Sequence, residues 1–240
     1  SDFAVEQKDD RSPLTAADLA SHHLIIEALG ALTPDVPVLS EESAGISWDA
    51  RSHWSRYWLV DPLDGTREFV KRNGEFTVNI ALIDRHRPVL GVVQRPVGGE
   101  LASAWDGGGA WLAESPGAPP RRLATRPRPA PLVVAGSRSH ASPREDALLA
   151  RLGDRSKLPL GSSLKFVRIA AAEADLYLRL GATSEWDTAA GQCVVEQAGG
   201  AVLDLAGRVL TYNARESLTN PEFFAVGDRA ADWSALLEPL

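Results

Sequence analysis

The chain has 240 residues, 44% of them hydrophobic and 24% charged, which is typical of a globular protein and speaks against disorder. Its 32 acidic residues outnumber its 25 basic ones, giving a net charge of −7, and the basic residues are scattered, which argues against duplex nucleic acid as a partner. The single cysteine, Cys193, excludes an intramolecular disulfide, and the lack of a membrane-length apolar stretch or a signal peptide predicts a cytoplasmic protein without an integral membrane segment.

The pattern in the first half of the chain predicts a helix followed by a largely antiparallel sheet. Apolar residues first recur at helical spacing, and later segments become β-branched and apolar, separated by polar or glycine-rich turns. The polar turn at 84–87 favours a hairpin, which further strands extend into a meander. We expect the helix at 15–32 and strands at 36–39, 57–60, 76–82, 88–93, 100–105 and 110–112.

The second half of the chain alternates strands with helices. The proline- and arginine-rich stretch 115–131 favours a connecting loop, so we predict a metal-binding α+β half at 1–128 and an α/β half at 129–240. Cys193 falls in an apolar helical run, which indicates a buried structural thiol. We expect strands at 132–135, 176–180 and 201–204 and near Leu158, and helices at 144–152, 165–174 and 188–198.

The run Asp61-Pro62-Leu63-Asp64-Gly65-Thr66 places two carboxylates and a hydroxyl on a predicted turn that follows a continuously apolar strand. Pro62 fixes one backbone angle and Gly65 permits a left-handed one, as in ordinary surface turns, which remain the alternative interpretation. Two carboxylates this close repel each other when both are ionised, so the arrangement suits a bound divalent cation. Strand ends are also where open α/β sheets place their ligands.

Carboxylates from other predicted elements could join this turn. Asp18 lies in the first helix, Glu41 follows the short second element, and Asp187 stands just ahead of the last predicted helix. Taken singly, these residues are ordinary features: a polar helix face, a solvated loop charge and a helix N-cap. Together they are oxygen ligands with no histidine or cysteine among them, which favours Mg²⁺ or Mn²⁺ over zinc. Thr66, paired with Glu41, could orient a water for phosphoester hydrolysis.

Four segments appear in an order and spacing that resemble the inositol monophosphatase superfamily, the lithium-sensitive, magnesium-dependent phosphatases. The segments are 8–18, 40–42, 61–66 and 186–191. Within the superfamily the chain is most similar to the bacterial 3'(2'),5'-bisphosphate nucleotidases, and the likeness runs from about Lys8 to Phe224. The resemblance implies a layered α/β fold, a five-layer α-β-α-β-α sandwich with the active site in the cleft between the two halves.

The resemblance also implies two or three Mg²⁺ ions per site, with Mn²⁺ as a possible substitute. Asp18 falls where a carboxylate assists a further, weaker metal or its water, and Glu41 with Thr66 matches the pair that activates the nucleophilic water. The implied metal ligands are the side chains of Glu41, Asp61, Asp64 and Asp187 and the backbone carbonyl of Leu63.

Substrate choice is expected to lie mainly in the second half of the chain. Segments 136–140 and 161–165 match parts of the bisphosphate nucleotidases that contact the adenosine and its 5'-phosphate. The residues themselves make 161–165 a small-residue turn that opens a helix and carries a cation, which suits a phosphate as well as a plain helix cap. The amides of Gly65 and Thr66 would face the phosphate that is hydrolysed. The full set of implied substrate contacts is Glu41, Leu63, Asp64, Gly65, Thr66, Ser137, His140, Gly161, Lys165 and Asp187.

The activity implied by the resemblance is hydrolysis of the 3'-phosphate of adenosine 3',5'-bisphosphate to AMP, by in-line attack of a metal-activated water, linked to sulfate assimilation. The sulfated analogue is a further expected substrate. Inositol or sugar monophosphate hydrolysis on the same metal site is the alternative, and a non-catalytic, metal-dependent nucleotide sensor is a minor one. Haloacid dehalogenase chemistry fits poorly, because Asp61 and Asp64 are three residues apart instead of two. Oligomeric state and peripheral association with the cytoplasmic side of the inner membrane stay open.

Overall fold

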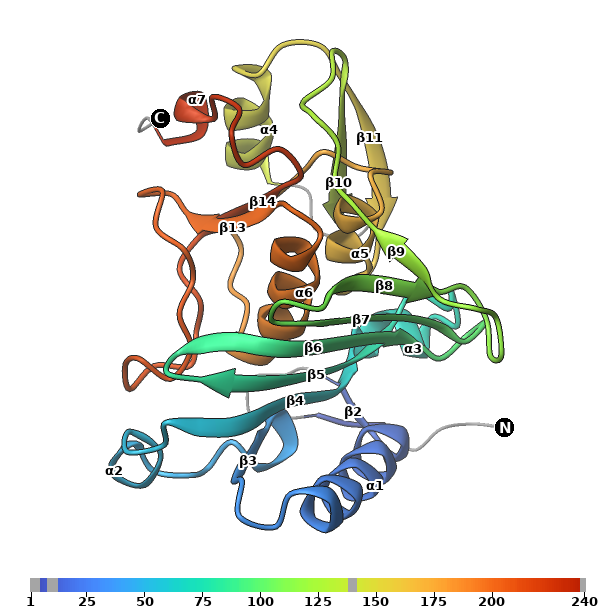
Figure 1. The fold of residues 1–240 in the computed structure, drawn as a ribbon, viewed down its shortest axis with the longest axis vertical. Helices are drawn as coiled ribbons and strands as arrows, with labels where there is room; N and C mark the ends of the chain where they lie inside the picture. The colour runs from blue at the N-terminus through green and yellow to red at the C-terminus, as the bar shows by residue number, and fades with distance from the viewer. Residues whose placement is uncertain (1–4, 8–12, 138–141, 238–240) are drawn as a thin grey trace.

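The computed structural model describes residues 5–7, 13–137 and 142–237, and these form five layers (Figure 1). Helix α1 (Ala16–Leu32) covers the outer face of a seven-stranded sheet. Helices α5 (Leu164–Ala170) and α6 (Glu185–Gln197) lie between this sheet and a five-stranded one. Helices α4 (Pro143–Ala150) and α7 (Ser234–Leu237) cover the far face of the second sheet. The predicted five-layer α-β-α-β-α sandwich is confirmed.

The seven-stranded sheet contains the predicted meander. Its order is β3-β4-β5-β6-β7-β8-β9; β3 runs parallel to β4, and every other neighbouring pair is antiparallel. The β5–β6 hairpin closes on Arg85 and His86, both with positive φ, which matches the right-handed twist of the paired strands. The strands are β3 (Val38–Ser40), β4 (Arg56–Asp64), β5 (Thr77–Asp84), β6 (Arg87–Arg95), β7 (Glu100–Trp105), β8 (Gly109–Ala113) and β9 (Arg121–Leu123).

Strand β4 does not turn after Val60, and the predicted turn at this point is wrong. The strand continues to Asp64, with a shift in its register against β5 between Asp61 and Asp64. Pro62 lies within this shift, where a residue without an N–H costs the ladder no hydrogen bond. The chain then turns at Gly65, whose φ of 89° is left-handed, and enters helix α3 (Thr66–Val70).

The five-stranded sheet is mixed, and the predicted α/β alternation accounts for only part of it. Strand β10 runs parallel to both β11 and β12, as expected for strands joined through helices, whereas β14 is antiparallel to both of its neighbours. The order is β11-β10-β12-β14-β13. The strands are β10 (Leu132–Ser137), β11 (Arg155–Leu160), β12 (Leu176–Arg179), β13 (Ala201–Asp204) and β14 (Phe223–Val226), the last of which the sequence pattern missed.

Several short elements also escaped sequence-based prediction. They are β1 (Val5–Gln7) and β2 (Pro13–Thr15), which pair antiparallel, the 3₁₀ turn η1 (Glu41–Ser43), α2 (Trp48–Arg51), α3, β9 and α7. Elements of three to five residues contain too little of a helical or strand period to be recognised.

The main hydrophobic core lies between the sheets and is centred on α6. Phe166 of α5 stacks on Phe223 and meets Tyr177 edge to face. Helix α6 approaches β6 closely at Gly91, where an added Cβ would lie 2.5 Å from the carbonyl oxygen of Ala190. Cys193 is buried in this contact, as predicted, and burial raises the pKa of its thiol to about 12.

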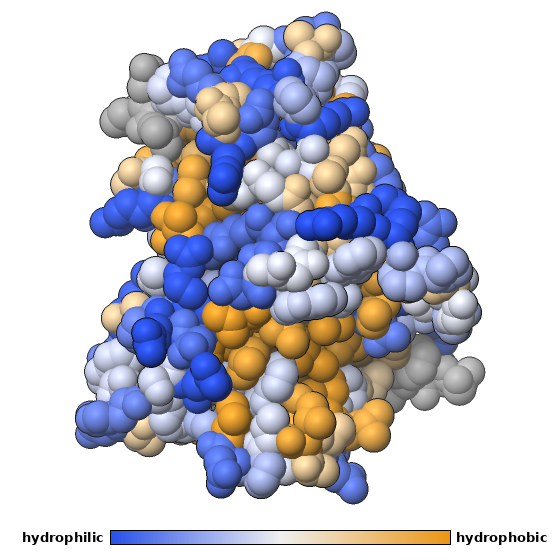
Figure 2. All heavy atoms as spheres, in the orientation of Figure 1, coloured by the Kyte–Doolittle hydropathy of each residue, from blue (hydrophilic) through white to orange (hydrophobic). Residues whose placement is uncertain are grey.

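The predicted division at residue 128 falls between β9 and β10. The main core contains residues from both sides of this point, and the division into two halves stays a prediction. A separate cluster under α1 contains Leu29, Trp58 and Val60. Figure 2 shows apolar side chains gathered on the visible face of the molecule, over the seven-stranded sheet and α1. Within the described ranges, no helix is long and apolar enough to cross a membrane.

Candidate active site

Three of the predicted metal ligands come together at the boundary between the layers. Asp61 and Asp64 stand at the end of β4, and Asp187 stands in the first turn of α6. Each offers one carboxylate oxygen, and these oxygens all lie within 4.8 Å of one another. The sequence therefore identified correctly which distant carboxylates would meet.

Asp187 reaches this cluster from a different position than expected. Helix α6 begins at Glu185, earlier than predicted, so Asp187 lies inside the helix and not just ahead of it. Ser184 is the N-cap residue, and its backbone N–H donates to Oδ2 of Asp187 at 2.8 Å, as part of a capping box. This bond helps to fix the orientation of the Asp187 carboxylate.

Glu41 joins the cluster through strand register. Strand β3 pairs in parallel with β4 so that Ser40 lies beside Val60, which brings the next residue, Glu41, alongside Asp61. The side chain of Glu41 hydrogen-bonds the carboxyl group of Asp61. Two carboxyl groups can share such a bond only when one of them holds a proton.

The electrostatics of the cluster indicate that it is built for a cation. Burial raises the pKa of Asp61 well above its usual range, and the charges of Glu41, Asp64 and Asp187 raise it further. Burial and the charge of Asp64 raise the pKa of Asp187 to about 8. A divalent cation would offset this repulsion and hold the carboxylates ionised, and the all-oxygen donor set fits a hard metal.

Asp64 is held more rigidly than its neighbours. Its Oδ2 atom accepts hydrogen bonds from the backbone N–H of Ser163 at 2.7 Å and from the Ser163 hydroxyl at 2.8 Å. It also accepts from Oγ1 of Thr77 at 3.2 Å and from Nδ2 of Asn79 at 3.3 Å. The polar residues Thr77 and Asn79 at core-facing positions of an otherwise apolar strand were the overlooked signal.

Asp18 and Thr66 also meet. Asp18 is buried in α1, against the expectation for a polar helix face, and its Oδ1 accepts from Oγ1 of Thr66 at 3.5 Å. The Thr66 hydroxyl lies equally far from the carbonyl oxygen of Leu63. Helix α1 is attached to this segment by Ser21, which donates to the carbonyl oxygen of Pro62 at 2.8 Å. The sequence analysis did not predict this contact with Asp18, and the pairing of Thr66 with Glu41 on a water stays a prediction.

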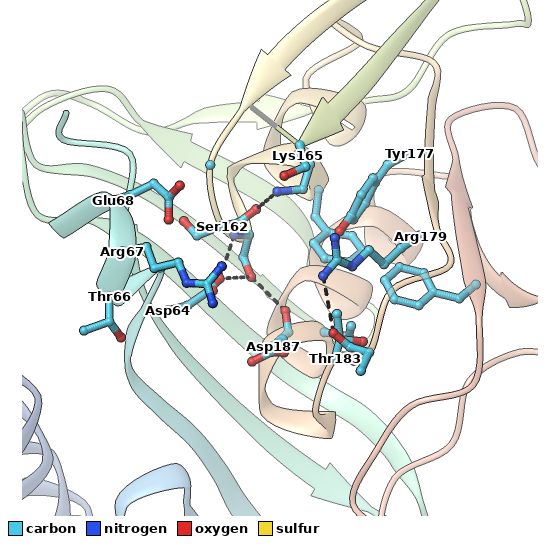
Figure 3. Close-up of a pocket in the computed structure, with 18 residues that line it drawn as sticks. Asp64, Thr66, Arg67, Glu68, Ser162, Lys165, Tyr177, Arg179, Thr183 and Asp187 are labelled. Carbon is cyan, nitrogen blue, oxygen red and sulfur yellow. Dashed lines mark hydrogen bonds between the residues drawn. The ribbon is translucent and has the colours of Figure 1, made fainter. Parts of the chain in front are cut away.

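A cavity of about 220 Å³ opens beside the carboxylates and is lined by the predicted Gly65, Ser137, Gly161 and Lys165 as well as Asp64, Thr66 and Asp187. Figure 3 shows the guanidinium groups of Arg67 and Arg179 on either side of Asp64 and Asp187. The Nε atom of Arg179 is buried and lacks a hydrogen-bond partner within the part of the chain that the structure describes. Neither arginine was predicted, because a sequence does not show where the side chain of an isolated arginine points in the folded protein.

Lys165 lines the cavity but already has partners. Its Nζ donates to the carbonyl oxygens of Ser162 at 2.5 Å and Leu160 at 3.4 Å, and it lies 5.1 Å from the ring centre of Tyr177. Burial, with a smaller contribution from Arg179, lowers the pKa of Lys165 to about 8. Its predicted contact with a second phosphate stays a prediction.

Of the other predicted substrate residues, some line the cavity and one lies outside the described part of the chain. Gly161 donates its backbone N–H to Glu75 at 2.9 Å, and an added Cβ would lie 2.4 Å from the Glu75 carbonyl oxygen, so this position requires glycine for close packing. Ser137 ends β10 at the cavity. His140 lies outside the described residues, and the proposed roles of the Gly65 and Thr66 amides stay predictions.

The sequence and the fold of this chain are similar to those of known proteins. A sequence model of the inositol monophosphatase family matches residues 1–233. The chain is 52% identical over 219 residues to the 3'(2'),5'-bisphosphate nucleotidase CysQ of Escherichia coli strain K12, covering 91% of this chain and 87% of that protein. It is 37% identical over 235 residues to CysQ of Haemophilus influenzae, covering 98% and 87%. Its fold is similar to the crystal structure of CysQ from Bacteroides thetaiotaomicron, a bacterial member of the inositol monophosphatase family, with a TM-score of 0.82, 38% identity and coverage of 92% and 87%.

Proposed function

This chain belongs to the inositol monophosphatase family, and from that premise we propose that it is a 3'(2'),5'-bisphosphate nucleotidase acting on adenosine 3',5'-bisphosphate. The products are AMP and inorganic phosphate. Relatives 51% and 52% identical to it carry this activity in their names. The proposal extends to the sulfated analogue as a second substrate, and so to a role in sulfate assimilation; a cytoplasmic location remains a prediction of the sequence.

The family is metal-dependent, and the carboxylate cluster fits a hard divalent cation because it is oxygen-only, crowded and partly buried. We assign Mg²⁺, two or three ions per site with Mn²⁺ as a substitute, to the side chains of Glu41, Asp61, Asp64 and Asp187 and the carbonyl of Leu63. When bound, such ions activate a water and neutralise charge on the phosphate.

The residues around the cluster orient the attacking water. The Thr66 hydroxyl has one proton and two acceptors at 3.5 Å, Oδ1 of Asp18 and the Leu63 carbonyl oxygen. When it donates to Asp18, the lone pairs of Oγ1 are left to accept a hydrogen bond from a water. The distance of 3.5 Å is long, as is common for catalytic hydrogen bonds before substrate is bound. No covalent intermediate is needed, since the water attacks the phosphorus directly.

One observation carries the choice of a bisphosphate substrate. The cavity beside the carboxylates is also lined by the basic side chains of Lys165, from α5, and Arg179, from β12, whose positive charges could bind a second phosphate of the same molecule (Figure 3). The buried, unpartnered Nε of Arg179 supports this assignment, because a buried donor is stabilised by an anion that accepts from it. An inositol monophosphate has no second phosphate to offer.

The experiment is a phosphate-release assay with adenosine 3',5'-bisphosphate, adenosine 3'-monophosphate and inositol 1-phosphate, each with Mg²⁺ and with EDTA. The bisphosphate should give the highest kcat/KM, and EDTA should abolish release from all three. A higher kcat/KM for inositol 1-phosphate would overturn the proposal in favour of the monophosphatase alternative. Binding of the bisphosphate without phosphate release would indicate the nucleotide sensor.

A further inference from the structure

Ser163 lies where three elements of the site meet. It precedes α5, and its side chain is buried, with an exposed fraction of 2%. Its hydroxyl oxygen lies 2.8 Å from Oδ2 of Asp64, on β4, and 2.8 Å from the backbone carbonyl oxygen of Asp187, on α6. The residue thus touches two of the three aspartates of the cluster.

The hydroxyl is fully engaged. It accepts a hydrogen bond from Nδ2 of Asn79 at 2.9 Å, and its single proton is available to either Asp64 or the Asp187 carbonyl. The backbone N–H of Ser163 donates to the same Oδ2 atom of Asp64, so both donors of one residue lie within hydrogen-bond distance of this carboxylate oxygen. Bonds from a backbone N–H and from a hydroxyl to one carboxylate fix its rotation about χ2.

From these contacts we infer that Ser163 is a positioning residue that sets the separation and orientation of Asp64 and Asp187, and thereby the affinity of the site for a divalent cation. The inference rests on the metal site of the proposed function. Residues that hydrogen-bond metal ligands orient them, and their loss typically weakens metal affinity or activity about 10- to 100-fold. Ser163 acts on two ligands at once, through a side chain and through a helix backbone.

The neighbouring Ser162 provides a matched control in the same loop. Its hydroxyl donates to the backbone carbonyl oxygen of Glu75 at 3.0 Å and lies 3.4 Å from Thr77 Oγ1. Neither of these atoms belongs to a predicted metal ligand. Removing the two hydroxyls one at a time therefore compares the same chemical change at adjacent positions.

The test measures Mn²⁺ binding without substrate, from the electron paramagnetic resonance signal of free Mn²⁺, for the wild type, Ser163→Ala and Ser162→Ala. Ser163→Ala should bind Mn²⁺ about 10- to 100-fold more weakly, whereas Ser162→Ala should bind it as the wild type does. Equal weakening in both variants would show that the loop acts as a whole, and unchanged binding by Ser163→Ala would also overturn the inference.

Two further measurements separate positioning from general damage. Excess Mn²⁺ should restore phosphate release by Ser163→Ala toward the wild-type rate, and a loss that metal does not restore would overturn the inference. Ser163→Cys keeps nearly the same side-chain volume with a weaker donor, so it should also lose Mn²⁺ affinity and can carry the test alone if Ser163→Ala does not fold. A wild-type protein that binds no Mn²⁺ would instead contradict the proposed metal site itself.

Discussion

The hydroxyl oxygen of Thr66 lies 3.5 Å from a carboxylate oxygen of Asp18, although 48 residues separate the two in the sequence. Asp18 is presented by α1 from the outer side of the seven-stranded sheet, and Thr66 begins the helix that follows β4. The two meet because Ser21 attaches α1 to the Pro62 carbonyl within the irregular end of that strand. In the proposed function, this pair links α1 to the attack of water.

Replacing Thr66 with alanine should lower kcat much more than it raises KM. A hydroxyl that orients the attacking water acts mainly in the transition state, so a loss of about 10²- to 10⁴-fold in kcat is expected. Steady-state kinetics on adenosine 3',5'-bisphosphate would measure it, with Thr66→Ser as the control that keeps the hydroxyl and most of the activity. A change confined to KM would assign Thr66 to substrate binding.

Asp64→Asn should abolish turnover while leaving the fold intact. An asparagine can keep its oxygen toward the donors of Ser163, Thr77 and Asn79, but it presents an uncharged amide to the cation. Removing one of the mutually repelling charges should raise the melting temperature of the metal-free protein near neutral pH. Retention of more than a few per cent of activity at saturating Mg²⁺ would disprove the role of Asp64 as a metal ligand.

The metal-free protein should lose stability as the pH rises from about 4 to about 8. The pKa of Asp187 is raised to about 8 in the folded state, so the folded protein keeps a proton that the unfolded chain releases near pH 4. Burial shifts the pKa of Asp61 and of Glu185 in the same direction, the latter to about 7. Stability from these groups is complete below the unfolded pKa and is lost as the pH passes the folded one.

Thermal unfolding in EDTA across this pH range measures the effect, as a falling melting temperature. Mg²⁺ should flatten the slope, because it binds the ionised form of the cluster, and Asp187→Asn should flatten it without metal. A melting temperature that rises with pH in EDTA would contradict the raised pKa values.

Lys165→Ala and Arg179→Ala should reduce activity on the bisphosphate more than on adenosine 3'-monophosphate. Each removes a cation proposed to bind the second phosphate, an interaction of roughly 1.5–3 kcal/mol, or about 10- to 150-fold in affinity. Comparing kcat/KM for both substrates in the wild type and each variant cancels general damage. Because Lys165 also bonds the Ser162 carbonyl, equal losses on both substrates would assign it to loop support, leaving Arg179 to read the second phosphate.

The sequence alone was sufficient to predict which three aspartates lie together, and most of the long elements. Asp61, Asp64 and Asp187 are separated by up to 126 residues, yet each lies in a recognisable local motif, and the structure brings all three together. The meander was equally readable, since its strands are β-branched, apolar segments separated by polar or glycine-rich turns. The layered fold followed from the motifs through family resemblance.

Tertiary structure alone decided how the ligands are supported and paired. The sequence did not reveal that Thr66 faces Asp18, that Ser163 joins Asp64 to α6, or that Arg179 points into the cavity. Hydrogen bonds between distant side chains depend on strand register and helix packing, which local patterns do not encode. The start of α6 shows the same limit. The sequence pattern placed Asp187 just before the helix, whereas the helix begins after the capping box residue Ser184, and Asp187 lies in its first turn.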